Sequence, residues 1–307
     1  MLYIFRDQPS MSAKLLAEAV DGIRLRRPEN LLRRARATDK VVMWGTCVPA
    51  IRGLVLNNIP LQNKYEDAMK LKAAGIRTIE VGKTRPAPVA TVAPPDPLLP
   101  IWDDAQDAAE AFTQLVLTRN PVAQTGVKEL IDKLGKVKAG MLTAAPVAPP
   151  QTVGEWLGRK YHHVGGNDLL TPKTTPDFYV KKETFVNEYR VHSFLGKSIR
   201  AGKKIPRTPQ GETPFTGTPH PWVRSFNAGW WLTYDDEALG DNKQQKRDLA
   251  HKAVKTLGLN FGAVDIGETG RGELIVLEIN RAPGVENGTV EAYARSIRKW
   301  ASGEWTA

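Results

Sequence analysis

The sequence predicts a mixed fold in which a small α/β domain precedes an α+β domain, and three observations indicate it. Short apolar strands alternate with helical patterns over the first 84 residues. Two proline-rich stretches, at 85–100 and 145–150, then interrupt the chain. The remainder is dominated by strand patterns and ends in a hairpin and a last amphipathic helix at 289–300.

The first 84 residues are expected to form a small, mostly parallel α/β domain. Strands are predicted at 2–5, 23–25, 41–45, 53–57 and 76–81. A first helix follows Ser10 or Ser12, either of which can be its N-cap. A second helix begins after Asn63, with Glu66 and Asp67 in its first turn. Strands that alternate with helices are typical of a parallel sheet.

A linker and a helical segment are predicted to separate this domain from the rest. Residues 85–102 are too rich in proline for a regular helix and are interpreted as a semi-rigid linker. Residues 103–150 contain two helical patterns and are interpreted as an insertion of unassigned role. The main domain is expected to span 151–307.

The composition favours a soluble protein with anionic partners. The chain has 43 basic and 33 acidic residues, a net charge of +10 that suits nucleotide phosphates, acidic substrates or nucleic acid. Because the basic residues are scattered, a dedicated nucleic-acid-binding protein is not favoured. There is no apolar run of membrane-helix length and no signal-peptide layout. The single cysteine, Cys47, is expected to be buried and suits the cytoplasm.

The C-terminal hairpin carries the most specific chemistry. Residues 261–266 and 274–279 are predicted as strands joined by a glycine-containing turn. Glu278 and Asn280 then point to one face, and Asp265 approaches the same spot from the neighbouring strand. Two carboxylates and an amide oxygen are hard ligands that suit Mg²⁺. The alternative is a hairpin with a solvated polar face.

A second candidate for phosphate binding follows the strand that begins at Trp156. Arg159 and Lys160 precede a glycine pair at 165–166. Such a pair lets backbone N–H groups approach a phosphate, and a nearby cation binds its oxygens. An ordinary hairpin turn explains the glycines equally well. The adjacent histidines at 162–163 face opposite sides of a strand and make a poor metal pair.

The hairpin motif also resembles a known family. Asp265, the Glu278-x-Asn280 pair and the following Ala-Pro-Gly at 282–284 resemble the metal-binding end of the ATP-grasp superfamily of carboxylate–amine ligases. Within it, the chain is most similar to the group of ribosomal-protein glutamate ligases and glutathione synthetases, including phage-type members. The resemblance implies an ATP-grasp fold preceded by a small pre-ATP-grasp α/β domain.

The resemblance implies roles for residues around the nucleotide. It places Glu183 at a hinge that meets adenine and Glu188 on the ribose hydroxyls. Lys204 matches a basic position that binds phosphate, and either Arg159 or Lys160 matches the cation before a glycine-rich lid. Asp265, Glu278 and Asn280 would hold Mg²⁺ (or Mn²⁺) ions that bridge the ATP phosphates.

The resemblance further implies a ligation centre and a reaction. Arg190 would face the phosphates or the acceptor, and Arg224 and Asn227 would lie on a strand lining the acyl-transfer centre. A carboxylate would attack the γ-phosphorus of ATP to give an acyl phosphate and ADP, and an amine would then displace phosphate. The expected partners are small-molecule or peptide carboxylates and amines, whose identity stays open, as does the oligomeric state. The alternatives are a non-catalytic or nucleic-acid-binding protein on this fold, or an ATP-grasp kinase.

Overall fold

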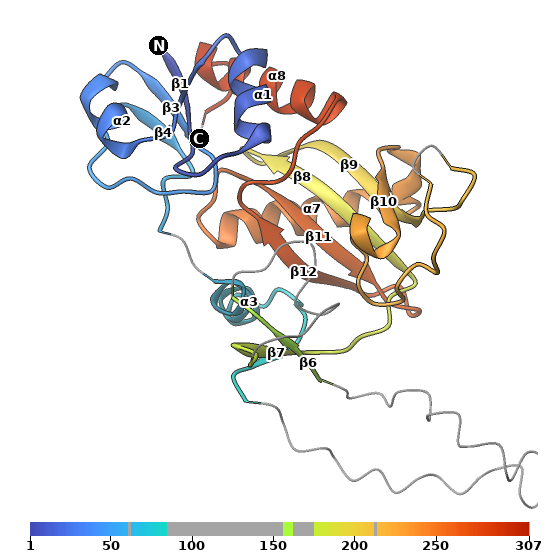
Figure 1. Cartoon of the computed structure of the whole chain (residues 1–307). Helices are drawn as coiled ribbons and strands as arrows, with labels where there is room; N and C mark the ends of the chain where they lie inside the picture. Colours follow the sequence, from blue (N-terminus) through green and yellow to red (C-terminus); the bar gives the residue numbers. More distant parts are fainter. Residues whose placement is uncertain (61–62, 85–155, 162–174, 212–213, 307) are drawn as a thin grey trace, which may run out of the picture. The chain divides into compact units, whose positions relative to one another are not determined.

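The computed structural model describes residues 1–60, 63–84, 156–161, 175–211 and 214–306. The chain divides into two compact units, one formed by Met1–Pro86 with Trp156–Ala307 and the other by Ala87–Glu155. The linker predicted at 85–102 and the insertion predicted at 103–150 lie outside the described residues. All helices and strands described below belong to the first unit (Figure 1).

The N-terminal segment forms a four-stranded parallel sheet, as predicted. Its strands lie in the order β2-β1-β3-β4 and span Ile23–Leu25, Leu2–Phe5, Lys40–Met43 and Leu54–Leu56 respectively. Helix α1 (Met11–Ala19) connects β1 to β2. Its N-cap is Ser10, whose hydroxyl accepts a hydrogen bond from the Ala13 N–H at 3.2 Å. The alternation of strands and helices therefore gave the correct parallel topology.

A short helix in this region was not predicted. Helix α2 (Pro28–Arg34) begins with proline at a first-turn position and has Glu29 there too, while Arg33 and Arg34 lie in its last turn. Proline tolerates the first helical turn, and these charges complement the helix dipole. Pro28 at the start and the arginine pair at the end are the sequence signals that indicate this helix.

Helix α3 (Lys64–Ala73) confirms the predicted N-cap, since the Asn63 side chain and the Glu66 side chain form a capping box. The strand predicted at 76–81 is wrong for most of its length. Only Val81–Gly82 is a strand (β5), with one isolated bridge between Thr78 and Val276. The Arg77 carbonyl, the Thr78 hydroxyl and the Ile79 N–H all bond to Val276 of β12, so the pairing with β12 is confined to one residue of that strand. Instead, β5 joins a three-stranded sheet of order β5-β7-β6, in which β7 is Phe178–Lys181 and β6 is Trp156–Arg159.

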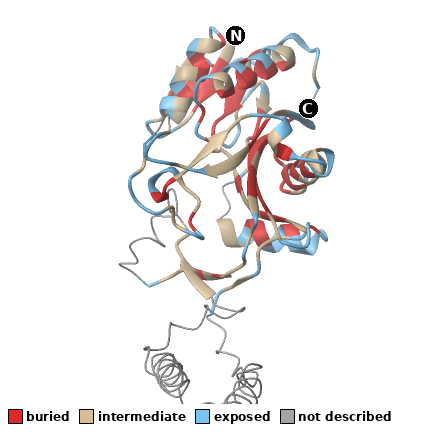
Figure 2. Ribbon diagram, turned by 90° about the vertical axis from the view of Figure 1, so that its right-hand side faces the viewer, coloured by how far each residue is buried: buried red, intermediate tan, exposed pale blue. Residues whose placement is uncertain are grey.

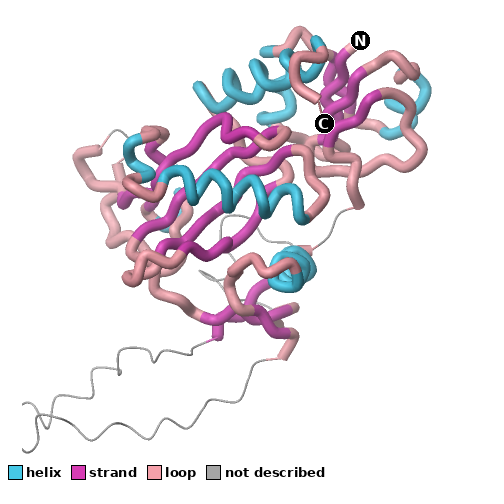
Figure 3. The backbone as a smooth tube through the Cα atoms, turned by 180° about the vertical axis from the view of Figure 1, so that it is seen from behind, coloured by secondary structure: helices cyan, strands magenta, loops and turns pink. Residues whose placement is uncertain are grey.

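The largest sheet has five antiparallel strands in the order β10-β9-β8-β11-β12. These strands span Trp230–Thr233, Lys197–Pro206, Asn187–Phe194, Phe261–Glu268 and Leu274–Asn280 respectively. The predicted C-terminal hairpin is thus confirmed as the β11–β12 pair. Helix α7 (Lys243–Thr256) covers one face of the sheet (Figure 3), where its Ala250 and Val254 join a core with Val191 and Val264.

The strand on which the resemblance placed Arg224 and Asn227 does not include either residue. Only Trp230–Thr233 is a strand, and Phe226–Ala228 forms a 3₁₀ turn, η2. The Ser225 carbonyl accepts from the Ala228 and Trp230 N–H groups, which closes the turn. Gly229 follows with a φ of +86°, a left-handed conformation that ends the turn and that glycine adopts without strain. A glycine in this conformation cannot continue a strand.

A second core joins the parallel sheet to the five-stranded sheet. Trp44 stacks on Phe261 at 5.2 Å between ring centroids and meets Tyr293 edge-on at the same distance. Tyr293 belongs to helix α8 (Gly288–Ser302), the predicted last helix, which packs against α1. The buried residues of these elements are red in Figure 2. Cys47, expected to be buried, is only half-buried.

Among the described residues, no helix is both long and apolar enough to cross a bilayer.

Candidate active site

The face of the five-stranded sheet opposite α7 carries the candidate site. Asp265 is paired directly with Arg190 on β8 and with Glu278 on β12. Directly paired residues share a face, and so do residues two apart on one strand. Glu188 and Asn280 therefore join the same face. We call this set of side chains, together with Lys204, the polar face.

Asp265 is the centre of the polar face. Its two carboxylate oxygens accept hydrogen bonds from Arg190 Nε at 2.6 Å and Arg190 Nη2 at 2.8 Å. Lys204 Nζ lies 3.2 Å from Oδ2. Burial by itself would raise the pKa of Asp265, but the charges of Arg190 and Lys204 outweigh it and hold the pKa below its ordinary value. Asp265 is therefore an ionised carboxylate with its side chain only 4% exposed.

Lys204 connects Asp265 to a second buried carboxylate, Glu188. Its ammonium lies 3.1 Å from Glu188 Oε2. Burial lowers the pKa of Lys204, but Asp265 and Glu188 outweigh that effect and raise the pKa above its ordinary value. Lys204 is thus a permanent cation between two anions. A polyanionic ligand would meet it at the centre of the face.

Arg224 reaches the polar face from the loop before η2. Its Nε lies 3.4 Å from Glu188 Oε1, an ion pair without hydrogen-bond alignment. Its Nη2 donates to the Phe185 carbonyl at 2.5 Å. The resemblance placed Arg224 on a strand, which is wrong, but its side chain does reach Glu188 of the polar face. Asn227 is exposed in η2, and no hydrogen bond joins it to the described part of the polar face.

Glu278 is bound by a residue that the sequence analysis did not single out. Lys64 Nζ, at the first position of α3, lies 2.5 Å from Glu278 Oε2. Burial would raise the pKa of Glu278, but Lys64 outweighs this and the pKa is strongly lowered. A lysine at a helix N-terminus opposes the helix dipole, so a nearby anion stabilises it there. Its position at the helix N-terminus was therefore the sequence signal that Lys64 has a carboxylate partner.

The two candidate phosphate-binding cations, Arg159 and Lys160, interact with different acidic residues. Lys160 Nζ pairs with Asp177 at 2.9 Å and also donates to the Thr175 carbonyl. Arg159, at the end of β6, instead exerts its charge on Glu278 and helps to lower the pKa of that carboxyl. The charge of Arg159 therefore acts on the polar face. The residues at 162–163 and 165–166 lie outside the described part of the chain.

The predicted hinge residue Glu183 lies half-buried in the loop between β7 and β8. Its charge acts on Arg77, which pairs with Glu273 at 2.6 Å. Phe185 of the same loop packs on Gly267 of β11, where an added Cβ would lie 2.5 Å from the Phe185 ring. The absence of a side chain at Gly267 therefore lets the loop approach the sheet.

The buried residue His192 lies on β8 next to the polar face, on the same side of the sheet. His192 follows Glu188 and Arg190 at two-residue spacing on β8. Its Nδ1 lies 3.2 Å from the Tyr293 hydroxyl and its Nε2 lies 3.3 Å from the Tyr234 hydroxyl. Burial, together with the charge of Arg190, lowers the pKa of His192 to about 3, so the ring is neutral. One tyrosine therefore donates to it and the other accepts.

The donor set fits a hard divalent cation. Asn280 Nδ2 donates to Glu278 Oε1 at 3.1 Å, which leaves the amide oxygen as the free ligand atom. Asp265 and Glu278 would add carboxylate oxygens from neighbouring strands. The described residues contain no cluster of three or more His, Cys, Asp or Glu side chains around one point. A site with two carboxylates and an amide suits Mg²⁺, which usually keeps waters and shares substrate phosphates.

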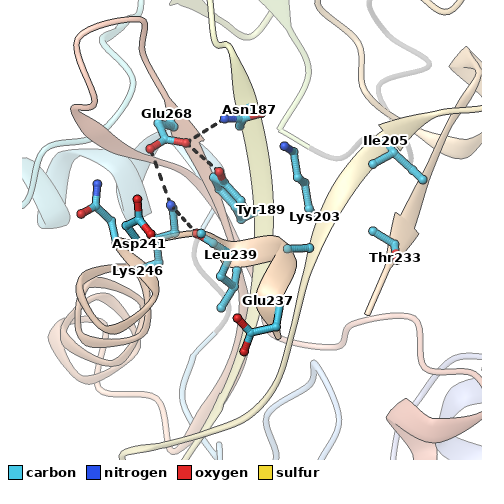
Figure 4. Close-up of a pocket in the computed structure, with 13 residues that line it drawn as sticks. Asn187, Tyr189, Lys203, Ile205, Thr233, Glu237, Leu239, Asp241, Lys246 and Glu268 are labelled. Atoms are coloured by element: carbon cyan, nitrogen blue, oxygen red, sulfur yellow. Dashed lines mark hydrogen bonds and ion pairs between the residues drawn. The ribbon is translucent and has the colours of Figure 1, made fainter. Parts of the chain in front are cut away.

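A pocket of about 490 Å³ lies on the other face of the sheet, next to α7 (Figure 4). One of its lining residues is the partly buried Glu268, which accepts from the Tyr189 hydroxyl at 2.6 Å and Asn187 Nδ2 at 2.9 Å. Lys246 Nζ lies 3.6 Å from Glu268 and donates to the Leu239 carbonyl at 2.7 Å. Lys246 thus connects Glu268 on the sheet with the η3 turn (Glu237–Leu239). The pocket is separate from the polar face.

Comparison with solved structures identifies the fold. The chain is similar to D-alanine–D-alanine ligase from Bacillus anthracis, with a TM-score of 0.53 and 12% identity over 99% of each chain. It is also similar to the D-cycloserine synthetase DcsG, with a TM-score of 0.51 and 14% identity over 98% of this chain and 99% of that one. No family model and no curated protein matches the sequence. The chain therefore has the ATP-grasp fold that the C-terminal hairpin predicted.

Proposed function

We propose that this protein is an ATP-dependent ligase that joins a carboxylate to an amine through an acyl phosphate. The observation that carries the proposal is the arrangement of Asp265, Glu278 and Asn280 beside the partly buried cations Arg190 and Lys204. Three oxygen ligands next to two cations suit a metal–polyphosphate complex, because such a complex carries both positive and negative charge. The ATP-grasp fold supports the same proposed function.

Each residue has a proposed part in holding the reactants. Asp265, Glu278 and Asn280 would bind Mg²⁺ (or Mn²⁺), which supplies charge neutralisation to the phosphates. Lys204 and Arg159 would contact phosphate oxygens, while Glu188 accepts from the ribose hydroxyls and Glu183 lies beside adenine. Lys160, held by Asp177, would support the strand end instead.

The transfer steps depend on positioning. Arg190 would orient the γ-phosphate and the carboxylate that attacks it, and Arg224 would approach the acyl phosphate from the opposite loop. Asn227 would contact the acceptor only if η2 rearranges when substrate binds. Phosphoryl transfer needs alignment and charge stabilisation and no protein nucleophile. The amine then attacks the acyl carbon, an amide bond forms, and phosphate leaves.

ADP release tests the proposal. The full chain is incubated with ATP, Mg²⁺ and mixtures of amino acids, and ADP and amide products are measured by mass spectrometry. We expect ADP release that requires both a carboxylate and an amine. Asp265→Asn combined with Glu278→Gln should lower it by at least about a hundredfold, the scale of losing a charge-stabilising group. Glu273→Gln, which removes a carboxylate paired with Arg77 outside the polar face, is the control.

Two other outcomes would replace the proposal. ADP release with a carboxylate or hydroxyl compound alone, without an amine requirement, would indicate a kinase. Tight and steeply salt-dependent binding of RNA or DNA, with no ATP turnover, would indicate a nucleic-acid-binding protein that has kept the fold.

A further inference from the structure

The pocket drawn in Figure 4 lies behind the side chains that we assign to the nucleotide. Asn187 and Lys203 line it, whereas their chain neighbours Glu188 and Lys204 belong to the polar face. Neighbouring residues on a strand point to opposite faces of the sheet, so β8 and β9 separate the two sites. The volume of about 490 Å³ is within the range of about 300–1,000 Å³ that small-molecule sites occupy. The pocket therefore has room for a small ligand.

Most of the charged groups that line the pocket are already paired within the protein. The Lys246 ammonium lies 3.6 Å from Glu268 and 4.2 Å from the centroid of the Tyr189 ring. Glu237, whose side chain is 82% exposed, pairs with Lys243 at 3.1 Å. The charges of both carboxylates are therefore compensated without a ligand.

Two lining charges of opposite sign lack such compensation. Neither Lys203 nor Asp241 forms an ion pair or a side-chain hydrogen bond with any residue that the structure describes. Lys203 is half-buried on the sheet, between its directly paired neighbours Tyr189 and Thr233. Asp241 is exposed in the loop before α7. A cation and an anion on different walls of one pocket complement a ligand that carries both charges.

The wall beside Lys203 offers an apolar contact as well. Ile205 follows Lys203 at two-residue spacing on β9 and therefore lies on the same face. Figure 4 shows Ile205 and Thr233 on the side of Lys203 away from Asp241. A ligand that reaches from Asp241 to Lys203 would thus extend its apolar part towards Ile205.

We propose that this pocket binds a free α-amino acid with an apolar side chain. The carboxylate of the ligand would pair with Lys203, its ammonium with Asp241, and its side chain would pack on Ile205. A simple anion such as phosphate fits less well, because it leaves Asp241 uncompensated and meets the lining carboxylates. The binding does not depend on the proposed ligase function.

A ligand in this pocket should also change the affinity of the polar face for nucleotide. Glu268, which lines the pocket, accepts from Asn187 Nδ2 at 2.9 Å, and its carbonyl accepts from the Val186 N–H at 2.8 Å. These bonds hold the end of the loop between β7 and β8 that is the proposed hinge. A ligand bound to Lys203 would order β8 and β9 from behind and favour the nucleotide-bound arrangement. This coupling rests on the proposed function.

Isothermal titration of the full chain with leucine, in the absence of ATP, tests the binding. We expect saturable binding that is at least tenfold weaker in Lys203→Met and at least threefold weaker in Asp241→Asn. Two analogues, 4-methylpentanoate without the ammonium and 3-methylbutylamine without the carboxylate, should each bind at least tenfold more weakly than leucine. Lys252→Met, which changes an exposed lysine on α7 outside the pocket, is the control and should not alter binding.

An amino acid that serves as a substrate of the proposed ligase would bind at the polar face, so one further variant separates the two sites. Asp265→Asn with Glu278→Gln should keep the affinity for leucine within twofold. Loss of leucine binding in that variant would overturn the proposal. So would no leucine binding by the wild type, unchanged binding in Lys203→Met at an unchanged melting temperature, or equal binding of 4-methylpentanoate.

A fluorescent ADP analogue tests the coupling. Leucine should tighten binding of the analogue at least threefold in the wild type and leave it unchanged in Lys203→Met. Linkage then requires the analogue to tighten leucine binding by the same factor. An analogue affinity that does not respond to saturating leucine would overturn the coupling. Leucine binding without any ADP release would reject the ligase alone, and ADP release without leucine binding would reject the pocket proposal alone.

Discussion

The Arg190 guanidinium holds both carboxylate oxygens of Asp265, with donor–acceptor distances of 2.6 and 2.8 Å. The fork of the guanidinium matches the carboxylate, so both hydrogen bonds are charge-assisted. Asp265 is 4% exposed and Arg190 21% exposed in their side chains. This pair, with Lys204, allows an ionised carboxylate to lie inside the protein.

Removing Arg190 should destabilise the fold as well as stop turnover. Arg190→Met leaves Asp265 with Lys204 alone, and the loss of one partner of a buried pair costs about 3 kcal/mol of unfolding free energy. Arg190→Lys should lose less stability but still lose turnover, because an ammonium cannot form the two-pronged contact. Urea unfolding measures the first effect and ADP release the second. An Arg190→Met variant as stable as the wild type would contradict this role of the pair.

Lys64 should compete with the metal for Glu278. The two side chains are 28% and 25% exposed, and a partly exposed pair is worth about 1 kcal/mol. Lys64→Met should therefore tighten Mg²⁺ binding about fivefold, the factor that corresponds to that energy. Isothermal titration with Mg²⁺ and ADP measures the change. Lys72→Met, an exposed lysine on the same helix, is the control. Weaker Mg²⁺ binding in Lys64→Met would indicate that Lys64 supports the ligands instead.

Gly267→Ala should displace the hinge loop. The new methyl group would lie 2.5 Å from the Phe185 ring, so the ring and its backbone must move, at a cost of about 1–3 kcal/mol. Because the Phe185 carbonyl is bound by Arg224, we expect nucleotide affinity to fall as well, by about tenfold for a shift of that energy. A fluorescent ADP analogue reports the affinity. Gly270→Ala, whose Cβ would meet only Val186 at 3.9 Å, should leave it unchanged.

Asp67 should make stability fall as pH rises from about 4 to about 6. Burial raises the pKa of Asp67 to about 6, even though Arg281 Nη2 lies 2.5 Å from its Oδ1 and favours the charged form. The folded state then holds a proton that the unfolded chain releases, so protonation stabilises the fold below pH 4 and this contribution is lost as pH passes 6. The shift corresponds to at most about 3 kcal/mol.

Asp67→Asn isolates this contribution, because it removes the titrating group at nearly constant shape. The unfolding free energy of the variant minus that of the wild type should increase between pH 4 and pH 7, by at most about 3 kcal/mol. Taking the difference cancels the opposite trend of Asp265 and Glu278, whose lowered pKa values make them lose stability on acidification. A difference that stays constant with pH would mean that Asp67 is ionised throughout.

Much of the fold and part of the site could be predicted from short stretches. The alternation of Glu278 and Asn280 placed this pair on one face because strand geometry is local. The glycine-containing turn brought β11 and β12 together, and Asp265 does lie opposite Glu278. The metal and nucleotide roles of these residues stay predictions.

The errors occurred where distant contacts decide the backbone. The stretch 76–81 is apolar enough for a strand, but its neighbour β12 offers only one bridging residue. Residues 222–229 were expected on a strand, but the Arg207 and His220 side chains and the Ser225 carbonyl bond to this loop, which makes a turn. The secondary-structure propensity of a short stretch reveals neither the short contact with β12 nor the hydrogen bonds within the loop.

The sequence by itself determined the parallel N-terminal sheet, the C-terminal hairpin, the main helix caps and the residue types of the polar face, since each depends on neighbours within a few positions. Only the tertiary structure decided which charges meet. Lys64 and Glu278 are separated by 214 residues, and Arg190 and Asp265 by 75. Such pairs form because burial removes water from a carboxylate and makes a nearby cation necessary, and no spacing in the chain encodes which cation will be near.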